Sequence, residues 1–170
     1  MTNAARSHDA AVAIRSATPA DVDAIFAMIV GLAEYERAPE AVTGTPDLLG
    51  TALFGPDPAA VALIAEHEGE IAGFALLHRT FSTWECREGL WLEDLFVWPA
   101  HRRHGIGEAL LRAGAALAVE RGATRYGWTA LDWNAPALAF YAKHGADVLS
   151  EWLIHRVSGD TIAELARGAK

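Results

Sequence analysis

Arg102-Arg103-His104-Gly105-Ile106-Gly107 lies directly after an apolar strand pattern and directly before a long helical pattern. Glycine has no Cβ, so a bulky anion can approach the main chain at Gly105 and Gly107. The N-terminus of the following helix directs free N–H groups and the positive end of its dipole to the same place. The stretch therefore predicts a strand–loop–helix unit that holds a pyrophosphate. We call residues 102–107 the glycine loop.

Length and composition indicate one domain with a substantial core. The chain has 170 residues, of which 52% are hydrophobic, and this composition argues against disorder. Six tryptophans are many for a chain of this length, so we expect some of them to line a site. We expect a flexible tail over residues 1–11 and a single domain over residues 12–170.

Charge and cysteine content narrow the classes of partner. The formal net charge is −8, and nucleic-acid binding needs a basic face, so we expect no nucleic-acid partner. An acidic protein suits a cationic substrate, although acidic charge is also common as an aid to solubility. Cys86 is the only cysteine, which excludes an internal disulfide. No apolar run approaches the ~20 residues of a membrane span, and the first residues lack an apolar secretory core. We therefore expect a cytoplasmic protein without membrane association.

Hydrophobic periodicity predicts an alternation of strands and helices. Strands are expected at residues 12–15, 60–67, 71–81, 88–97, 126–131 and 148–157. Helices are expected at residues 18–36, 45–54, 105–121, 134–144 and 161–166. This order predicts one α/β domain with three layers, in which helices cover both faces of a mixed sheet.

Two further motifs accompany the glycine loop. Leu92-Glu93-Asp94-Leu95-Phe96-Val97 precedes it, and Trp133-Asn134-x-Pro136 with Phe140-Tyr141 follows it. With the order of elements, the pattern Arg102-x-x-Gly105-x-Gly107 resembles the acyl-coenzyme A loop of the GCN5-related N-acetyltransferase superfamily. Within that superfamily, the motifs resemble those of the diamine (polyamine) and thialysine N-acetyltransferases. The resemblance runs from about residue 12 to residue 157 and implies a three-layer α/β/α acyl-CoA N-acyltransferase fold with a mostly antiparallel sheet.

The resemblance implies acetyl-CoA as the co-substrate. Backbone groups of residues 95–97 would pair with the pantetheine arm as with an added strand, and main-chain N–H groups of residues 103–107 would hold the pyrophosphate. The implied cofactor-binding residues are Leu95, Phe96, Val97, Arg102, Arg103, His104, Gly105, Ile106, Gly107, Asn134 and Lys143. We expect no metal, because His101 and His104 have no cysteine or carboxylate ligand near them in the sequence.

Acetyl transfer to an amine needs a base and an acid. An alkyl ammonium has a pKa near ~10.4 and becomes a nucleophile only after losing a proton. The resemblance implies Glu93 as the base, acting through water, and Tyr141 as the acid that protonates the leaving thiolate. Apolar neighbours of Glu93 favour a raised pKa, and a strand-edge amide near Phe96 could stabilise the oxyanion. No cysteine nucleophile is required, so we expect direct transfer.

The acceptor site is expected to be an acidic and aromatic cradle for an ammonium group. Its expected members are Tyr35, Glu36, Asp94 and Trp152, together with Glu93. Ideal strand alternation puts Glu93 and Asp94 on opposite faces, so both can serve only if the strand bulges there. The favoured acceptor is a primary amine of a small polyamine-like or lysine-like molecule.

Two alternative functions and one assembly remain open from the sequence. The acceptor could instead be a protein N-terminus, a lysine side chain or an antibiotic amine. The chain could also be a non-catalytic sensor that binds acyl-CoA, although a sensor needs neither Glu93 nor Tyr141. The resemblance implies a homodimer, with the late segment (residues 148–157) exchanged or packed between subunits.

Overall fold

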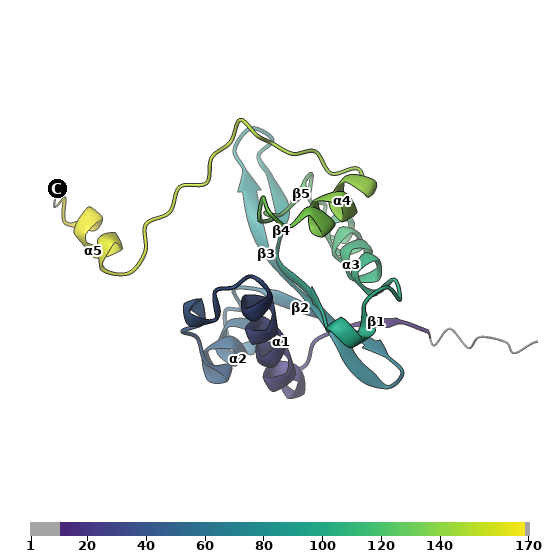
Figure 1. Ribbon diagram of the computed structural model, residues 1–170. Coiled ribbons are helices and arrows are strands. Elements are labelled where there is room, and N and C mark those ends of the chain that lie inside the picture. The colour runs from purple at the N-terminus through teal and green to yellow at the C-terminus, as the bar shows by residue number, and fades with distance from the viewer. Residues whose placement is uncertain (1–10, 169–170) are drawn as a thin grey trace, which may run out of the picture. The chain divides into compact units, whose positions relative to one another are not determined.

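A computed structural model describes residues 11–168 of the chain in two compact units, which meet between Thr129 and Ala130 in the sequence. The first unit contains the β-sheet, and the second contains two short helices (Figure 1). The expected flexible tail, residues 1–11, lies outside the described residues except for residue 11. Within residues 11–168, no helix is long and apolar enough to cross a membrane.

The first unit is built on a five-stranded sheet with the strand order β1-β2-β3-β4-β5. Neighbouring strands pair antiparallel, except that β4 and β5 are parallel and are connected through a helix. This arrangement confirms the expected mixed, mostly antiparallel sheet. The strands are β1 (Ala13–Ser16), β2 (Val61–His67), β3 (Glu70–Ser82), β4 (Arg87–Val97) and β5 (Tyr126–Gly127).

Helices cover both faces of this sheet, as a three-layer fold requires. The helices α1 (Val22–Tyr35) and α2 (Pro46–Phe54) pack on one face, and α3 (Ile106–Glu120) packs on the other (Figure 1). The helix α2 begins where the sequence predicts, because Thr45 caps it by accepting a hydrogen bond from the N–H of Leu48 at 3.3 Å.

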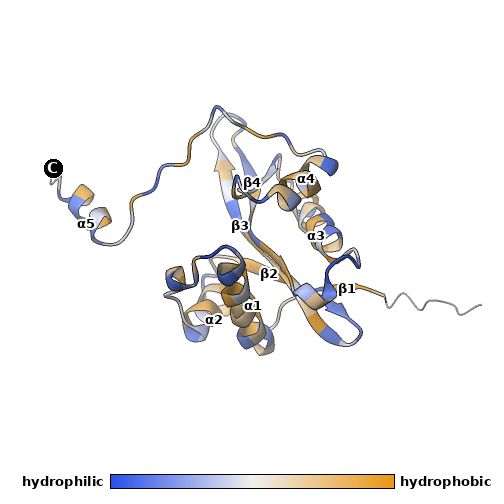
Figure 2. Cartoon of the chain, viewed as in Figure 1, coloured by the Kyte–Doolittle hydropathy of each residue, from blue (hydrophilic) through white to orange (hydrophobic). Residues whose placement is uncertain are grey.

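Two apolar layers hold the helices to the sheet. On the α1 side, Ile25 and Met28 are fully buried in one cluster with Phe74 of β3. On the α3 side, Ile106 and Leu110 are fully buried. The strands β2 to β4 are coloured mainly as hydrophobic in Figure 2, in keeping with a sheet that is covered on both faces. Each large apolar side chain buried in this way contributes roughly 1.5–3 kcal/mol.

A partly buried ion pair connects β1 to the beginning of α1. The guanidinium of Arg15 donates to both carboxylate oxygens of Asp21, at 2.7 and 2.8 Å. Asp21 also accepts hydrogen bonds from the N–H and the hydroxyl of Thr18. Arg15 thereby holds the pKa of Asp21 well below its usual range.

The second unit corrects the expectation of a last long strand. The late segment (residues 148–157) joins no strand of the sheet and is exposed, between α4 (Ala135–Lys143) and α5 (Asp160–Ala166). Its apolar residues have the composition of a strand, but a strand also needs a neighbour for its N–H and C=O groups.

In the first unit, the strand β5 is only two residues long, shorter than the expected residues 126–131.

Candidate functional site

A β-bulge interrupts β4 at the residues that the sequence assigns to catalysis. Leu77 of β3 pairs with Leu92, and Leu76 pairs with Asp94, so Glu93 is an extra residue between two regular pairs. A bulge breaks the alternation of side chains along a strand. The condition under which Glu93 and Asp94 can both serve one site is therefore met.

Beyond the bulge, β4 has an edge that no described strand covers. The strand β5 pairs only with residues 90–91 of β4. The N–H of Trp98 donates to the C=O of Ala72, next to β3, at 2.9 Å. Because backbone groups alternate along an antiparallel strand, those of Leu95 and Val97 point away from β3. An extended chain can pair with this edge as an added strand.

Phe96 has a different place from its two neighbours. By the same alternation its N–H and C=O face β3, and its side chain is buried in the core under α1. The edge amides that can reach a ligand are therefore those of Leu95 and Val97.

The glycine loop begins α3 with an unusual backbone. Gly105 is the N-cap of α3 with φ 76°, and Arg103 has φ 69°. No atom lies within 4 Å of the position that a Cβ would take at Gly105, so the main chain there is open. Ile106 is buried and fixes the helix, whereas residues 102–105 are exposed. Exposed amides at a helix N-terminus suit an anion.

The side chain of Arg102 holds the glycine loop against two other elements. Its Nε–H donates to the C=O of Val97 at 3.0 Å. Its guanidinium carbon lies 5.1 Å from the ring centre of Tyr35, the last residue of α1, and 5.8 Å from that of Phe96. The end of α1, the free edge of β4 and the glycine loop are thus connected by one residue.

Three carboxylates gather at the bulge and the end of α1. Burial, together with the charges of Glu93 and Glu36, raises the pKa of Asp94 from its ordinary 3.8 to about 6. Partial desolvation also raises the pKa of Glu36. These neighbours place one end of the expected acidic cradle together, next to Tyr35.

The environment of Glu93 corrects a sequence expectation. Glu93 was expected in an apolar pocket, but its side chain is 53% exposed, and its Oε2 lies 3.4 Å from Nε2 of His78 on β3. Asp94, the next residue, is half-buried, and this burial is the main cause of its raised pKa. His78 was not predicted, because the register that brings it near Glu93 depends on the bulge and cannot be read from residue types.

The remaining predicted residues belong to the second unit. Asn134 caps α4 by accepting a hydrogen bond from the N–H of Ala137 at 3.3 Å. Tyr141 and Lys143 lie on α4, where Tyr141 is half-buried and Lys143 is exposed. Trp152 lies in the late segment and is 64% exposed. The roles of these four residues stay predictions from the resemblance.

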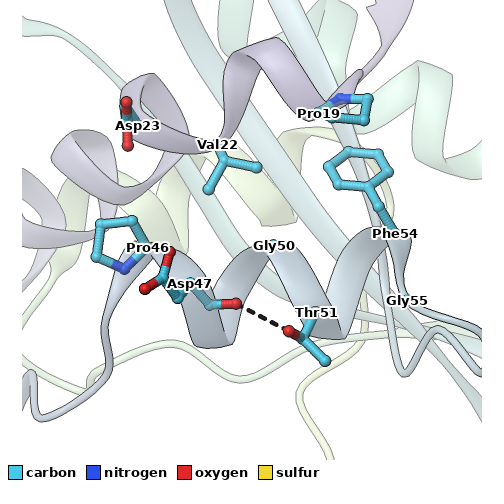
Figure 3. A pocket seen from close by; sticks show the side chains of 9 residues that line it. All are labelled: Pro19, Val22, Asp23, Pro46, Asp47, Gly50, Thr51, Phe54 and Gly55. Atoms are coloured by element: carbon cyan, nitrogen blue, oxygen red, sulfur yellow. Dashed lines mark hydrogen bonds between the residues drawn. The ribbon is translucent and has the colours of Figure 1, made fainter.

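A pocket of about 600 Å³ lies between the first turn of α1 and the length of α2, at the opposite end of α1 from Tyr35 (Figure 3). Thr51 donates there to the C=O of Asp47 at 3.0 Å, which is a contact within α2. No residue predicted for the site lines this pocket. Among residues 11–168, no group of three or more His, Cys, Asp or Glu side chains is arranged to hold a metal ion.

Comparisons of the sequence with known proteins agree on one class of enzyme. A model of the acetyltransferase (GNAT) family matches residues 29–146, which is more than half of the chain. Thialysine N-epsilon-acetyltransferase of Sus scrofa is 34% identical over 168 residues and covers 92% of this chain and 98% of its own length. L-ornithine N5-acetyltransferase NATA1 of Arabidopsis thaliana is 28% identical over 194 residues, with coverage of 88% and 85%. The solved structure of the integron cassette protein VCH_CASS6 of V. cholerae has a TM-score of 0.75 at 24% identity, covers 92% of this chain and 98% of its own, and shows a shared fold.

Proposed function

Because this chain belongs to the GNAT family of acetyltransferases and is an N-acetyltransferase, we propose that its acceptor is a small primary amine that carries a second ammonium group. Lysine-like amino acids and polyamines both meet this description. The observation that carries the proposal is the gathering of Glu36, Glu93 and Asp94 beside the uncovered edge of β4. An acceptor with two ammonium groups can pair each of them with a different carboxylate. Relatives named for thialysine and for L-ornithine, which are both diamino acids, support this class.

The family uses acetyl-CoA as its co-substrate, and the proposal assigns its parts to this chain. The pantetheine arm pairs with the outward groups of Leu95 and Val97, as an added strand does. The diphosphate is held by main-chain N–H groups of residues 103–107 at the beginning of α3. Asn134 and Lys143 contact the cofactor further along. This places the thioester next to the bulge and its carboxylates.

The three carboxylates, His78 and Tyr141 each have a part in the proposed transfer. Asp94 and Glu36 attract the ammonium groups of the acceptor. Glu93 takes one proton from the reacting ammonium through a water molecule, and the neighbouring half-buried His78 passes that proton to solvent. The neutral amine attacks the thioester carbon, the C–S bond breaks, and the thiolate takes a proton from the hydroxyl of Tyr141. An outward amide of Leu95 or Val97 donates to the oxyanion.

Assembly and location form the last part of the proposal. A homodimer is supported by the late segment (residues 148–157), where Trp152, Leu153 and Ile154 are 64–77% exposed. Sedimentation at several concentrations tests for the homodimer, and a monomer at all of them would contradict it.

A cytoplasmic location is supported by the lone exposed Cys86, which suits a reducing compartment.

An acceptor panel with acetyl-CoA tests the function. Thialysine, ornithine, spermidine, an aminoglycoside and a peptide with a free N-terminus are each offered, and release of free CoA thiol is followed. We expect the first three to be acetylated with the highest kcat/KM. A preference for the peptide or the aminoglycoside would contradict the acceptor class. Binding of acetyl-CoA without turnover of any amine would indicate the sensor instead.

A further inference from the structure

Three histidines from two parts of the chain meet beside the glycine loop. His67, on β2, is only 5% exposed, and its Nδ1 lies 3.2 Å from Nδ1 of His101. The ring of His67 also stacks on that of His104, with ring centres 4.8 Å apart and planes at 22°. Nε2 of His101 lies 3.5 Å from a carboxylate oxygen of Glu70 on β3. We call His67, His101 and His104 the histidine cluster.

The histidine cluster holds both ends of a strained backbone segment. His101 ends the turn Pro99–His101 just before the glycine loop, and His104 directly precedes Gly105. Between them, Arg103 has φ 69°, a left-handed conformation that residues with a side chain rarely adopt. His67 contacts the histidine on each side of this residue. It is therefore placed to fix the backbone of the exposed glycine loop.

We infer that His67 is a positioning residue, which fixes the glycine loop in its anion-binding form before the cofactor arrives. The inference rests on the proposed use of the loop amides for the diphosphate of CoA. Donors that are already in place bind more tightly, because no ordering entropy is lost on binding. His67 itself does not touch the cofactor and acts through His101 and His104.

The Nδ1–Nδ1 contact between His67 and His101 also makes the positioning of the glycine loop sensitive to acid. One nitrogen must donate and the other must accept, so the hydrogen bond needs one proton between the two rings. If His67 and His101 are both protonated, two N–H groups face each other and the hydrogen bond is lost. The titratable groups that face the pair are His104 from the glycine loop and Glu70 from β3. Acidification should therefore loosen the loop.

Three variants separate this role from a general effect on the fold. His67→Phe keeps a flat ring for stacking on His104 but loses the hydrogen bond. His67→Asn keeps an amide group near the position of Nδ1 and does not titrate. Ile64→Val removes one methyl group from the buried core of the same strand and serves as the matched control. Thermal unfolding of each variant establishes that it is folded.

Steady-state kinetics and hydrogen exchange then test the inference. We expect His67→Phe to raise the KM for acetyl-CoA about threefold to tenfold, the effect of one hydrogen bond, with kcat nearly unchanged. Hydrogen exchange of the peptide that covers residues 98–107 should be faster in the cofactor-free Phe variant. His67→Asn should restore both values toward wild type, and Ile64→Val should change neither. From about pH 8 to about pH 5, where histidine changes charge, the KM of wild type should rise relative to that of His67→Asn.

The two possible failures give different results. If CoA protects residues 98–107 from exchange in the wild type, but His67→Phe has wild-type KM and exchange, the positioning role of His67 is overturned while the proposed cofactor site stands. If CoA binds without protecting this peptide, the proposed use of the glycine loop fails, and the inference fails with it.

Discussion

Replacing Asp94 by asparagine removes a carboxylate that folding makes harder to ionise. Burial, with the charges of Glu93 and Glu36, raises the pKa of Asp94 from 3.8 to about 6. Each pKa unit corresponds to ~1.4 kcal/mol, so keeping this group ionised at neutral pH costs the folded protein at most about 3 kcal/mol. Asp94→Asn should therefore raise the free energy of unfolding by about 1–3 kcal/mol at pH 7, and Tm by ~2–12 °C.

The sign of the pH dependence follows from the direction of the pKa change. The folded protein binds this proton more tightly than the unfolded chain does. The resulting stabilisation is fully present below pH 3.8 and is lost as the pH rises through about 6. The stability of the variant relative to wild type should therefore grow between about pH 4 and pH 7 and then level off.

Thermal unfolding of both proteins over this pH range is the assay. Asp57→Asn, at an exposed loop position, is the matched control and should leave the difference flat. In the same preparations, Asp94→Asn should raise the KM of the amine about tenfold, because an ammonium loses a charged partner. The raised pKa of Asp94 would be refuted if the variant were no more stable than wild type at pH 7. It would also be refuted if the variant exceeded wild type in stability by the same amount at pH 4 and at pH 7.

Three further predictions concern other parts of the chain. Gly114→Ala should destabilise the fold by about 1–3 kcal/mol in denaturant unfolding, because its Cβ would overlap the hydroxyl oxygen of Tyr126. An effect below about 0.5 kcal/mol would show that α3 can shift freely. Asp21→Asn should destabilise the fold by about 1–3 kcal/mol at neutral pH, because its contacts with Arg15 are lost. The difference in stability from wild type should shrink below about pH 4, because the pKa of Asp21 is lowered in the folded state. A difference that is independent of pH would exclude the ion pair as its cause. Tyr141→Phe should lower kcat about 100-fold while calorimetry finds CoA binding unchanged, and an unchanged kcat would remove Tyr141 from the mechanism.

Elements with strong local signals could be predicted from the sequence. Thr45 and Pro46 begin α2 as expected, and the turn at Glu68-Gly69 joins β2 to β3. The glycine loop lies between a strand and a helix, as its pattern predicts. In each case the signal and the structure that it specifies lie within a few residues of each other.

Features that depend on distant pairing could not be predicted. The bulge at Glu93 depends on the register of β4 against β3, and the effect of the Glu36 charge on Asp94 depends on the end of α1 lying near β4. His67 and His101 are 34 residues apart in the sequence, so their contact has no local signal. The late segment was expected to be a strand because its residue types favour one, whereas strand formation also requires a partner.

The selectivity between cadaverine and pentylamine measures whether the carboxylates at the bulge choose the acceptor by its second charge. Both are unbranched five-carbon amines, and only cadaverine carries a second ammonium group. If Glu36, Glu93 and Asp94 select the acceptor by charge, kcat/KM should be about ten- to a hundredfold higher for cadaverine, and Asp94→Asn should narrow this ratio. Equal kcat/KM for the two amines in an enzyme that acetylates both would contradict the account.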